Sequence, residues 1–203
     1  GITSALLSLL NNLDKDKFNY YLTFTNRSVG ANKYVLKNLD NRISYIGSYD
    51  NKIGTFKEVL ILVLYMFKLI SYKKSSKYLE SYYKREIKRR YYNANFSYAV
   101  QYNGYGNNII RMFSYFPCDK CIFVHSDMSK EAKTRSNQNL ETLKNVYNIY
   151  DKVIVVSEGL LKPTASIKGN YDNIVVINNI IDYKTILEKK DKEIAFDDNT
   201  ESN

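Results

Sequence analysis

The chain has 203 residues, of which 44% are hydrophobic and 25% are charged. This composition is typical of one globular domain with a buried core, and it excludes a chain that is disordered over most of its length. An excess of 30 basic over 21 acidic residues gives a net charge of +9. The charge favours an anionic partner, and nucleic acid, anionic lipid, a polyphosphate polymer and a nucleotide-linked donor all meet that condition.

Helical periodicity alternates with short β-branched or apolar runs along the chain. The first part predicts helices at Ser4–Leu13 and Tyr34–Leu39 and strands at Tyr20–Thr25 and Arg42–Ile46. Two longer helices are predicted next, at Thr55–Ser71 and Ser76–Tyr92. The remaining strands are predicted at Tyr98–Tyr102, Lys120–His125, Lys152–Val156 and Asn173–Ile177. The remaining helices are predicted at Asn107–Tyr115, Leu140–Tyr150, Glu158–Ile167 and Tyr183–Lys189.

This alternation predicts an α/β, Rossmann-like fold with a mostly parallel sheet and helices on both faces. We expect one domain over residues 1–196, followed by a polar, acidic linker or tail over residues 197–203. In such a fold the first helix normally follows a strand and a tight glycine turn. We therefore expect a first strand upstream of Gly1, because without it two rows of backbone groups would lack partners.

Ligands of open α/β sheets bind beyond the carboxyl ends of the strands, which directs attention to His125, Ser157 and Asn178. His125 is the only histidine, and Ser126 and Asp127 follow it directly. An imidazole at this edge is suited to donate a hydrogen bond or to act as a general acid or base. The alternative is a structural histidine whose hydrogen bonds are satisfied within the fold.

Two helix starts offer backbone N–H groups to an anion. One is the N-terminal run Gly1, Ile2 and Thr3, and the other follows the strand that ends before Ser157 and Glu158. The alternative is capping alone, because Ser157 is a favourable N-cap residue and Glu158 complements the positive end of a helix.

Ten basic and three acidic residues fall between Lys57 and Arg90. Eight of the basic residues form the predicted contact with an anionic acceptor or membrane: Lys73, Lys74, Lys77, Lys84, Arg85, Lys88, Arg89 and Arg90. The apolar run Val59–Ile70 is too short to span a bilayer, although it could lie on an anionic membrane surface. The alternative is a core helix beside a solvated charged helix.

The two cysteines, Cys118 and Cys121, form a C-x-x-C pair just before an apolar run. A structural zinc site needs four ligands, and a thioredoxin-type pair begins a helix, so we expect a plain structural role. Two free cysteines fit a reducing compartment. We expect no metal site, because the sequence contains no zinc, EF-hand or Walker A motif.

These landmarks occur in the order found in a known family. The segments Gly1–Leu6, His125–Asp127, Asp151–Glu158 and Asn173–Asp182 together resemble the N-terminal domain of glycosyltransferase family 4. The string Val124–Glu131 is similar to the glycosyltransferase portions of bacterial proteins that build teichoic-acid-type polymers.

The resemblance implies a GT-B enzyme, in which two Rossmann-like domains face each other and the N-terminal one binds the acceptor. It implies that the backbone of Gly1, Ile2 and Thr3 approaches the donor diphosphate and that His125 is catalytic and contacts the transferred sugar. Ser126, Asp127, Ser157 and Glu158 would complete the substrate site. The nucleotide-sugar is then a substrate, and neither a metal nor a cofactor is required. The donor-binding domain is not among these 203 residues, so they should be inactive alone.

The expected function of the intact protein is hexosyl transfer from a nucleotide-sugar to a cell-envelope polymer or lipid-linked acceptor. The expected location is the cytoplasm, peripheral at the inner face of the plasma membrane. One alternative is a non-catalytic binding or scaffold module for an anionic polymer or membrane, and a lesser one is an epimerase. Nucleic-acid binding is disfavoured, because no RRM, KH or helix-turn-helix signature is present.

Overall fold

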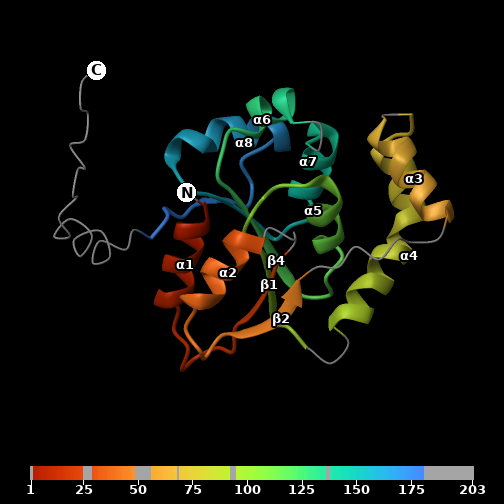
Figure 1. Ribbon diagram of the computed structural model, residues 1–203. Coiled ribbons are helices and arrows are strands. Elements are labelled where there is room, and N and C mark those ends of the chain that lie inside the picture. Colours follow the sequence, from red (N-terminus) through yellow and green to blue (C-terminus); the bar gives the residue numbers. More distant parts are fainter. Residues whose placement is uncertain are drawn as a thin grey trace, which may run out of the picture.

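The computed structural model describes residues 2–24, 29–48, 56–67, 69–91, 95–135 and 138–180. Within them the chain forms eight α-helices, one 3-10 helix and six strands, and every strand pair is parallel. Figure 1 shows centrally placed strands with helices around them and one pair of helices standing at the side. The predicted α/β, Rossmann-like class is confirmed.

The first part of the chain forms a two-stranded sheet with a small core of its own. Helix α1 (Ile2–Asn12) leads to strand β1 (Tyr21–Phe24), and helix α2 (Val29–Lys37) connects β1 to strand β2 (Ser44–Ser48). The buried apolar residues of this unit are Leu10, Leu22, Phe24, Val35 and Ile43.

The second part forms a four-stranded sheet in the order β3-β4-β5-β6. Its strands are β3 (Tyr98–Gln101), β4 (Asp119–Val124), β5 (Lys152–Val155) and β6 (Ile174–Val176). The connecting helices are α5 (Asn107–Phe113), α6 (Met128–Thr134), α7 (Leu140–Tyr147), the 3-10 helix η1 (Glu158–Leu160) and α8 (Leu161–Lys168). Since all four strands are parallel, their carboxyl ends lie along one edge.

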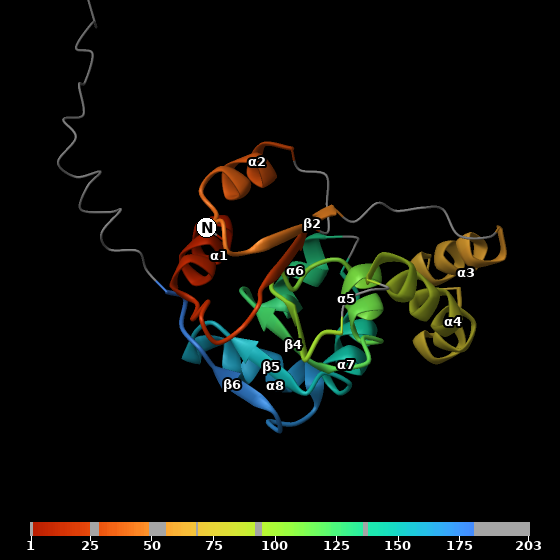
Figure 2. The ribbon, with the colours of Figure 1, turned by 90° about the horizontal axis from the view of Figure 1, so that it is seen from below.

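The two sheets share no strand pairing within the described residues, because β1 pairs with β2 and β3 pairs with β4. They are in contact nonetheless: the rings of Tyr21 in β1 and Phe96 before β3 pack edge to face, with centroids 5.5 Å apart. Figure 2 shows the two-stranded unit lying against the larger sheet. The strand expected upstream of Gly1 lies outside the described residues and stays a prediction.

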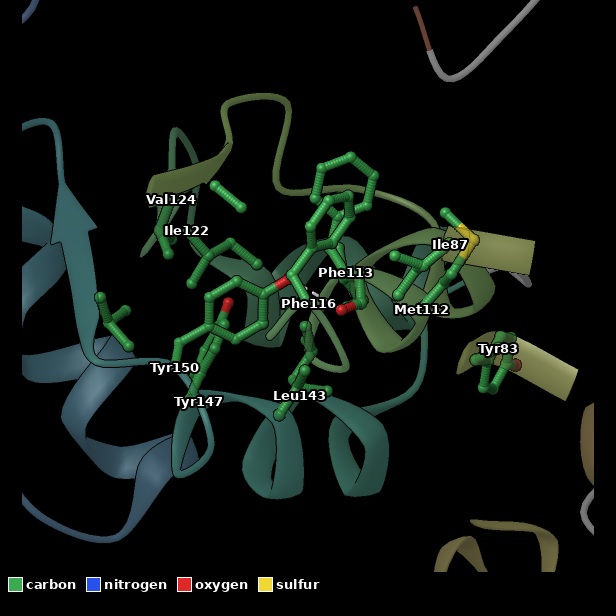
Figure 3. Close-up of a cluster of buried hydrophobic side chains, with 14 of the residues drawn as sticks. Tyr83, Ile87, Met112, Phe113, Phe116, Ile122, Val124, Leu143, Tyr147 and Tyr150 are labelled. Atoms are coloured by element: carbon green, nitrogen blue, oxygen red, sulfur yellow. Dashed lines mark hydrogen bonds between the residues drawn. The ribbon is translucent and has the colours of Figure 1, made fainter. Parts of the chain in front are cut away.

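The main core lies between the four-stranded sheet and the helices on one of its faces (Figure 3). Ile122 and Val124 of β4 point into this core, whereas Phe123 between them lies on the opposite face. Helix α7 contributes Leu143 and Tyr147 to the same cluster. These apolar runs therefore form buried strands, as their composition predicted.

Helices α3 (Phe56–Met66) and α4 (Tyr72–Tyr91) form a hairpin at the side of the molecule (Figure 1). An ion pair of 2.8 Å between Arg85 of α4 and Glu58 of α3 links the two helices. The hairpin is also bound to α7, because the backbone N–H of Tyr72 donates to the Glu141 carboxylate at 3.0 Å. Its position relative to the sheet is therefore set by polar contacts as well as by packing.

Arg111 of α5 is fully buried where the hairpin meets the domain. Its Nη2 donates to Ser75 Oγ at 2.9 Å and to Ser76 Oγ at 2.6 Å, both on α4. The guanidinium also lies 5.1 Å from the ring centroid of Tyr65 in α3 and 4.4 Å from that of Tyr72 in α4. One side chain thus attaches both helices of the hairpin to α5.

The boundary predicted between these two helices is wrong. Helix α3 ends at Met66, and α4 begins at Tyr72, four residues before the predicted start at Ser76. Ser71 explains the early start, because its Oγ accepts the backbone N–H of Lys74 at 3.3 Å, as an N-cap residue does. Helix α6 was not predicted. The predicted helix Tyr183–Lys189 and the tail over residues 197–203 lie outside the described residues.

Candidate functional site

The polar residues that follow β4 and β5 lie on one edge of the sheet. Val124, the last residue of β4, pairs in register with Val155, the last residue of β5. The pairing continues past the strands, since the Val156 N–H donates to the Val124 carbonyl at 3.3 Å. His125 and Ser157 therefore follow neighbouring strand ends, as the sequence predicted.

His125 is held by the backbone of the neighbouring strand. Its Nε2 lies 2.7 Å from the Tyr102 carbonyl oxygen, just after β3, and the two rings pack with centroids 4.7 Å apart. A carbonyl can only accept a hydrogen bond, so Nε2 carries the proton. Burial lowers the pKa of His125 below its ordinary value of 6.5, which favours the neutral ring. In that tautomer Nδ1 is a hydrogen-bond acceptor.

Gly104 allows the turn after β3 to run close to β4. Its φ is +70°, and a Cβ atom at this position would lie 2.3 Å from the Phe123 carbonyl oxygen. Its N–H donates to the side chain of Gln101 at 2.6 Å. Gly104 thereby fixes the path of the segment whose Tyr102 carbonyl binds His125.

Ser126 and Asp127 bond to neighbouring protein groups. The Tyr105 hydroxyl donates to Ser126 Oγ at 2.9 Å. Asp127 is the N-cap of α6, and its Oδ1 accepts the backbone N–H of Ser129 at 3.0 Å and the Ser129 hydroxyl at 2.5 Å. The hydrogen bond from the Ser129 hydroxyl is the main cause that lowers the pKa of Asp127. Asp127 therefore orders the segment after His125.

The other residues predicted to contact an anion follow β5 or begin helix α1. Ser157 is the N-cap residue of η1, and its exposed side chain forms no capping hydrogen bond. Glu158 is exposed at the first position of η1. Ile2 and Thr3 begin α1, whose start lies on the upper side of Figure 1, as α6 does. Gly1 lies outside the described residues.

A cavity of about 550 Å³ lies next to helix α6, the helix that follows His125 and Asp127 in the chain. Its walls come from the turn between α3 and α4, from α6 and from the start of α7. They include Ser71, Ser129, Lys133, Gln138 and Glu141. Since α6 is the helix that Asp127 caps, the cavity and the histidine edge share one structural element.

Gln138 is a candidate site residue that the sequence did not single out. Its side chain is buried and lines the cavity, and neither Oε1 nor Nε2 has a hydrogen-bond partner within the described residues. Buried amides are normally satisfied, so this one is suited to a ligand that offers both a donor and an acceptor. Gln138 lies in a polar stretch without a motif, and no local signal marked it.

The positive charge of helix α4 is partly neutralised by acidic side chains of α3 and of α4 itself. Four of the eight predicted residues form ion pairs within the hairpin: Lys84 with Glu80, Arg85 with Glu58, and Arg89 and Arg90 with Glu86. Lys73, Lys74 and Lys77 are exposed and form no ion pair in the part of the chain that the structure describes. The positive charge open to a partner is therefore concentrated at the start of α4.

Cys118 and Cys121 are free thiols. Burial raises the pKa of Cys121 to about 11, and it raises the pKa of Cys118 as well. Thiolate is the reactive and metal-binding form, so neither side chain is poised for redox or nucleophilic chemistry. Among the residues described, no group of three or more His, Cys, Asp or Glu side chains is placed to hold a metal ion.

Comparison with protein-family models gave no match for this chain, and comparison with curated proteins gave no significant match. The resemblance to glycosyltransferase family 4 therefore stays a prediction that rests on the residues quoted for it. What the geometry itself provides is an imidazole whose Nε2 is bound to the Tyr102 carbonyl and, on the far side of α6, a cavity lined by the Gln138 amide.

Proposed function

We propose that this chain is the acceptor-binding, N-terminal half of a GT-B glycosyltransferase of the family 4 type. The reaction is hexosyl transfer from a nucleotide-sugar to a phosphate-rich or lipid-linked cell-envelope acceptor, such as a teichoic-acid-type polymer. His125 carries the proposal, because its proton is fixed on Nε2 by the Tyr102 carbonyl and its Nδ1 is left as an acceptor.

In this reaction Nδ1 accepts the hydrogen bond of a hydroxyl on the transferred sugar. A neutral ring is required for that role, and burial favours the neutral form of His125. Holding the sugar in one orientation as the bond to the diphosphate breaks lowers the barrier by positioning. No metal or cofactor enters the scheme, and the start of α1, at Ile2 and Thr3, faces the departing diphosphate with its N–H groups.

The cavity between α6, α7 and the hairpin receives the acceptor. The Gln138 amide offers a donor nitrogen and an acceptor oxygen, a pair that matches two neighbouring hydroxyl groups. Lys133 on the cavity wall supplies a positive charge for a phosphate of the acceptor. The protein would act in the cytoplasm, at the inner face of the plasma membrane, where such acceptors are available.

The test is release of nucleoside diphosphate by the protein as its gene encodes it, with a panel of nucleotide-sugars and a glycerol phosphate polymer as acceptor. We expect His125→Ala to lower kcat by about 100-fold or more, the usual scale for a group that acts on the reacting sugar. His125→Gln, which keeps an N–H for the Tyr102 carbonyl but lacks the acceptor nitrogen, should be impaired to a similar degree.

Lys152→Ala is the control, because Lys152 is an exposed residue at the opposite end of β5. It should retain wild-type turnover. Equal turnover in the wild type and in His125→Ala would contradict the proposal. Binding of the polymer without any release of nucleotide would favour the non-catalytic binding module instead.

A further inference from the structure

The hairpin of α3 and α4 exposes large apolar side chains that the core does not use. Phe56 is 84% exposed, and Phe67, just after α3, is 67% exposed. With Leu60 and Val63 they recur at intervals of four, three and four residues, so they form one stripe along a single face of the helix. The opposite face carries Ile61, which is buried.

This apolar surface continues around the turn into α4. Met66 is 65% exposed and Leu69 is 69% exposed, so the turn presents large apolar groups at its tip. Figure 1 shows the hairpin at the side of the molecule, away from the sheet. Contiguous exposed apolar surface of this kind marks an interaction site.

Three lysines that form no ion pair with any described residue follow the apolar tip in the chain. Lys73, Lys74 and Lys77 are exposed in the first two turns of α4, and the first turn contains no acidic residue. Positive side chains are unfavourable at a helix N-terminus, where the backbone dipole is itself positive. An anion bound at this position would relieve that repulsion. The positive charge and the exposed apolar surface together indicate one partner that is both anionic and apolar.

We infer that the tip of the hairpin docks on an anionic lipid bilayer. Met66, Phe67 and Leu69 enter the boundary between headgroups and acyl chains, and Lys73, Lys74 and Lys77 contact lipid phosphates. No helix in the described part of the chain is long and apolar enough to cross a bilayer. The contact is therefore interfacial, the mode in which an apolar face and flanking basic residues act together.

Docking at the tip also brings the cavity to the membrane surface, because Leu69, Ile70 and Ser71 form part of its wall. An acceptor anchored in the bilayer would then reach Gln138 without leaving the lipid. This consequence rests on the proposed function, but the docking itself does not.

The chain has no tryptophan, which allows a direct test. Phe67→Trp places a single fluorophore at the tip, and Tyr171→Trp places one at an exposed position in the turn between α8 and β6. With vesicles of equimolar phosphatidylglycerol and phosphatidylcholine, we expect a blue shift of the emission for Phe67→Trp and none for Tyr171→Trp. Vesicles of phosphatidylcholine alone should give a much weaker shift.

Co-sedimentation with the same vesicles measures affinity. Replacing Lys73, Lys74 and Lys77 together by Gln should weaken binding by about 100-fold, since each lysine near an anionic surface contributes roughly a factor of five. A matched triple replacement at the exposed residues Lys33, Lys144 and Lys162 removes the same charge and should change binding little. Phe67→Ser combined with Leu69→Ser should abolish it.

Equal loss of binding in the two lysine triples, or an unshifted emission from Phe67→Trp, would overturn the inference. So would a mass that doubles with concentration in solution and returns to that of one chain in the Phe67→Ser, Leu69→Ser variant, because the tip would then join two copies. Circular dichroism of each variant confirms that it is folded. Vesicle binding without sugar transfer would leave this inference intact while contradicting the proposed function.

Discussion

At the residue scale, the protonation of His125 affects both the candidate site and the free energy of unfolding. Its pKa is lowered by burial, so between the ordinary value of 6.5 and the lower folded value the unfolded chain binds more protons. Its contribution to stability is therefore complete above pH 6.5 and is lost as the pH falls through the folded pKa. Because it is the only histidine, replacing it removes this titration alone.

We expect the free energy of unfolding of the wild type to fall between about pH 7 and about pH 5, and that of His125→Gln to change less over the same range. Urea unfolding at a series of pH values measures both. Parallel pH profiles for the two proteins would show that the imidazole is not buried in its neutral form.

Gly104 is the second residue on which the geometry of the site depends. Gly104→Ala should destabilise the fold by about 2–3 kcal/mol, since it combines a positive φ with a contact against the Phe123 backbone. Gly159→Ala is the matched control, because a Cβ there meets nothing within 4 Å and its backbone is not strained. Urea unfolding should find the control within roughly 1 kcal/mol of the wild type. Equal losses of stability in Gly104→Ala and Gly159→Ala would show that the turn at Gly104 is not in close contact with β4.

At the scale of elements, helix α6 gives Asp127 a structural role beside the substrate contact that the sequence predicted. A carboxylate directly after a strand end resembles a ligand contact, but here it caps the helix that follows. That helix has a polar sequence in which Met128 is the buried residue, so no apolar periodicity revealed it. The N-cap chemistry of Asp127 was the available signal.

The two roles of Asp127 predict different results. Asp127→Ala should cost about 1 kcal/mol of stability as a lost cap, whereas Asp127→Asn should cost much less, because asparagine caps as well as aspartate. Nucleotide release by Asp127→Asn should then stay near the wild-type rate. A large loss of turnover with unchanged stability in Asp127→Asn would indicate a substrate contact by the carboxylate instead.

At the scale of the whole molecule, the sequence predicted the α/β class and the approximate positions of the strands along the chain, because buried parallel strands need apolar runs, as in Ile122–Val124. It placed His125 and Ser157 at one edge by the same rule. It could not predict Arg111 or Gln138, since their surroundings come from distant segments. Ser75, which binds Arg111, is 36 positions away in the chain. Contacts between segments that are distant in the chain leave no pattern in the local sequence.

The most direct test of the whole account is the NMR signal of the His125 imidazole. The chain contains one histidine, so its ring carbons and nitrogens are assigned without ambiguity. We expect addition of a glycerol phosphate polymer together with a nucleotide-sugar to shift these signals in a saturable way. Gln138→Ala should weaken the shift, and Lys152→Ala should not affect it. Signals that do not move with any nucleotide-sugar or polymer would contradict a ligand site at this edge of the sheet.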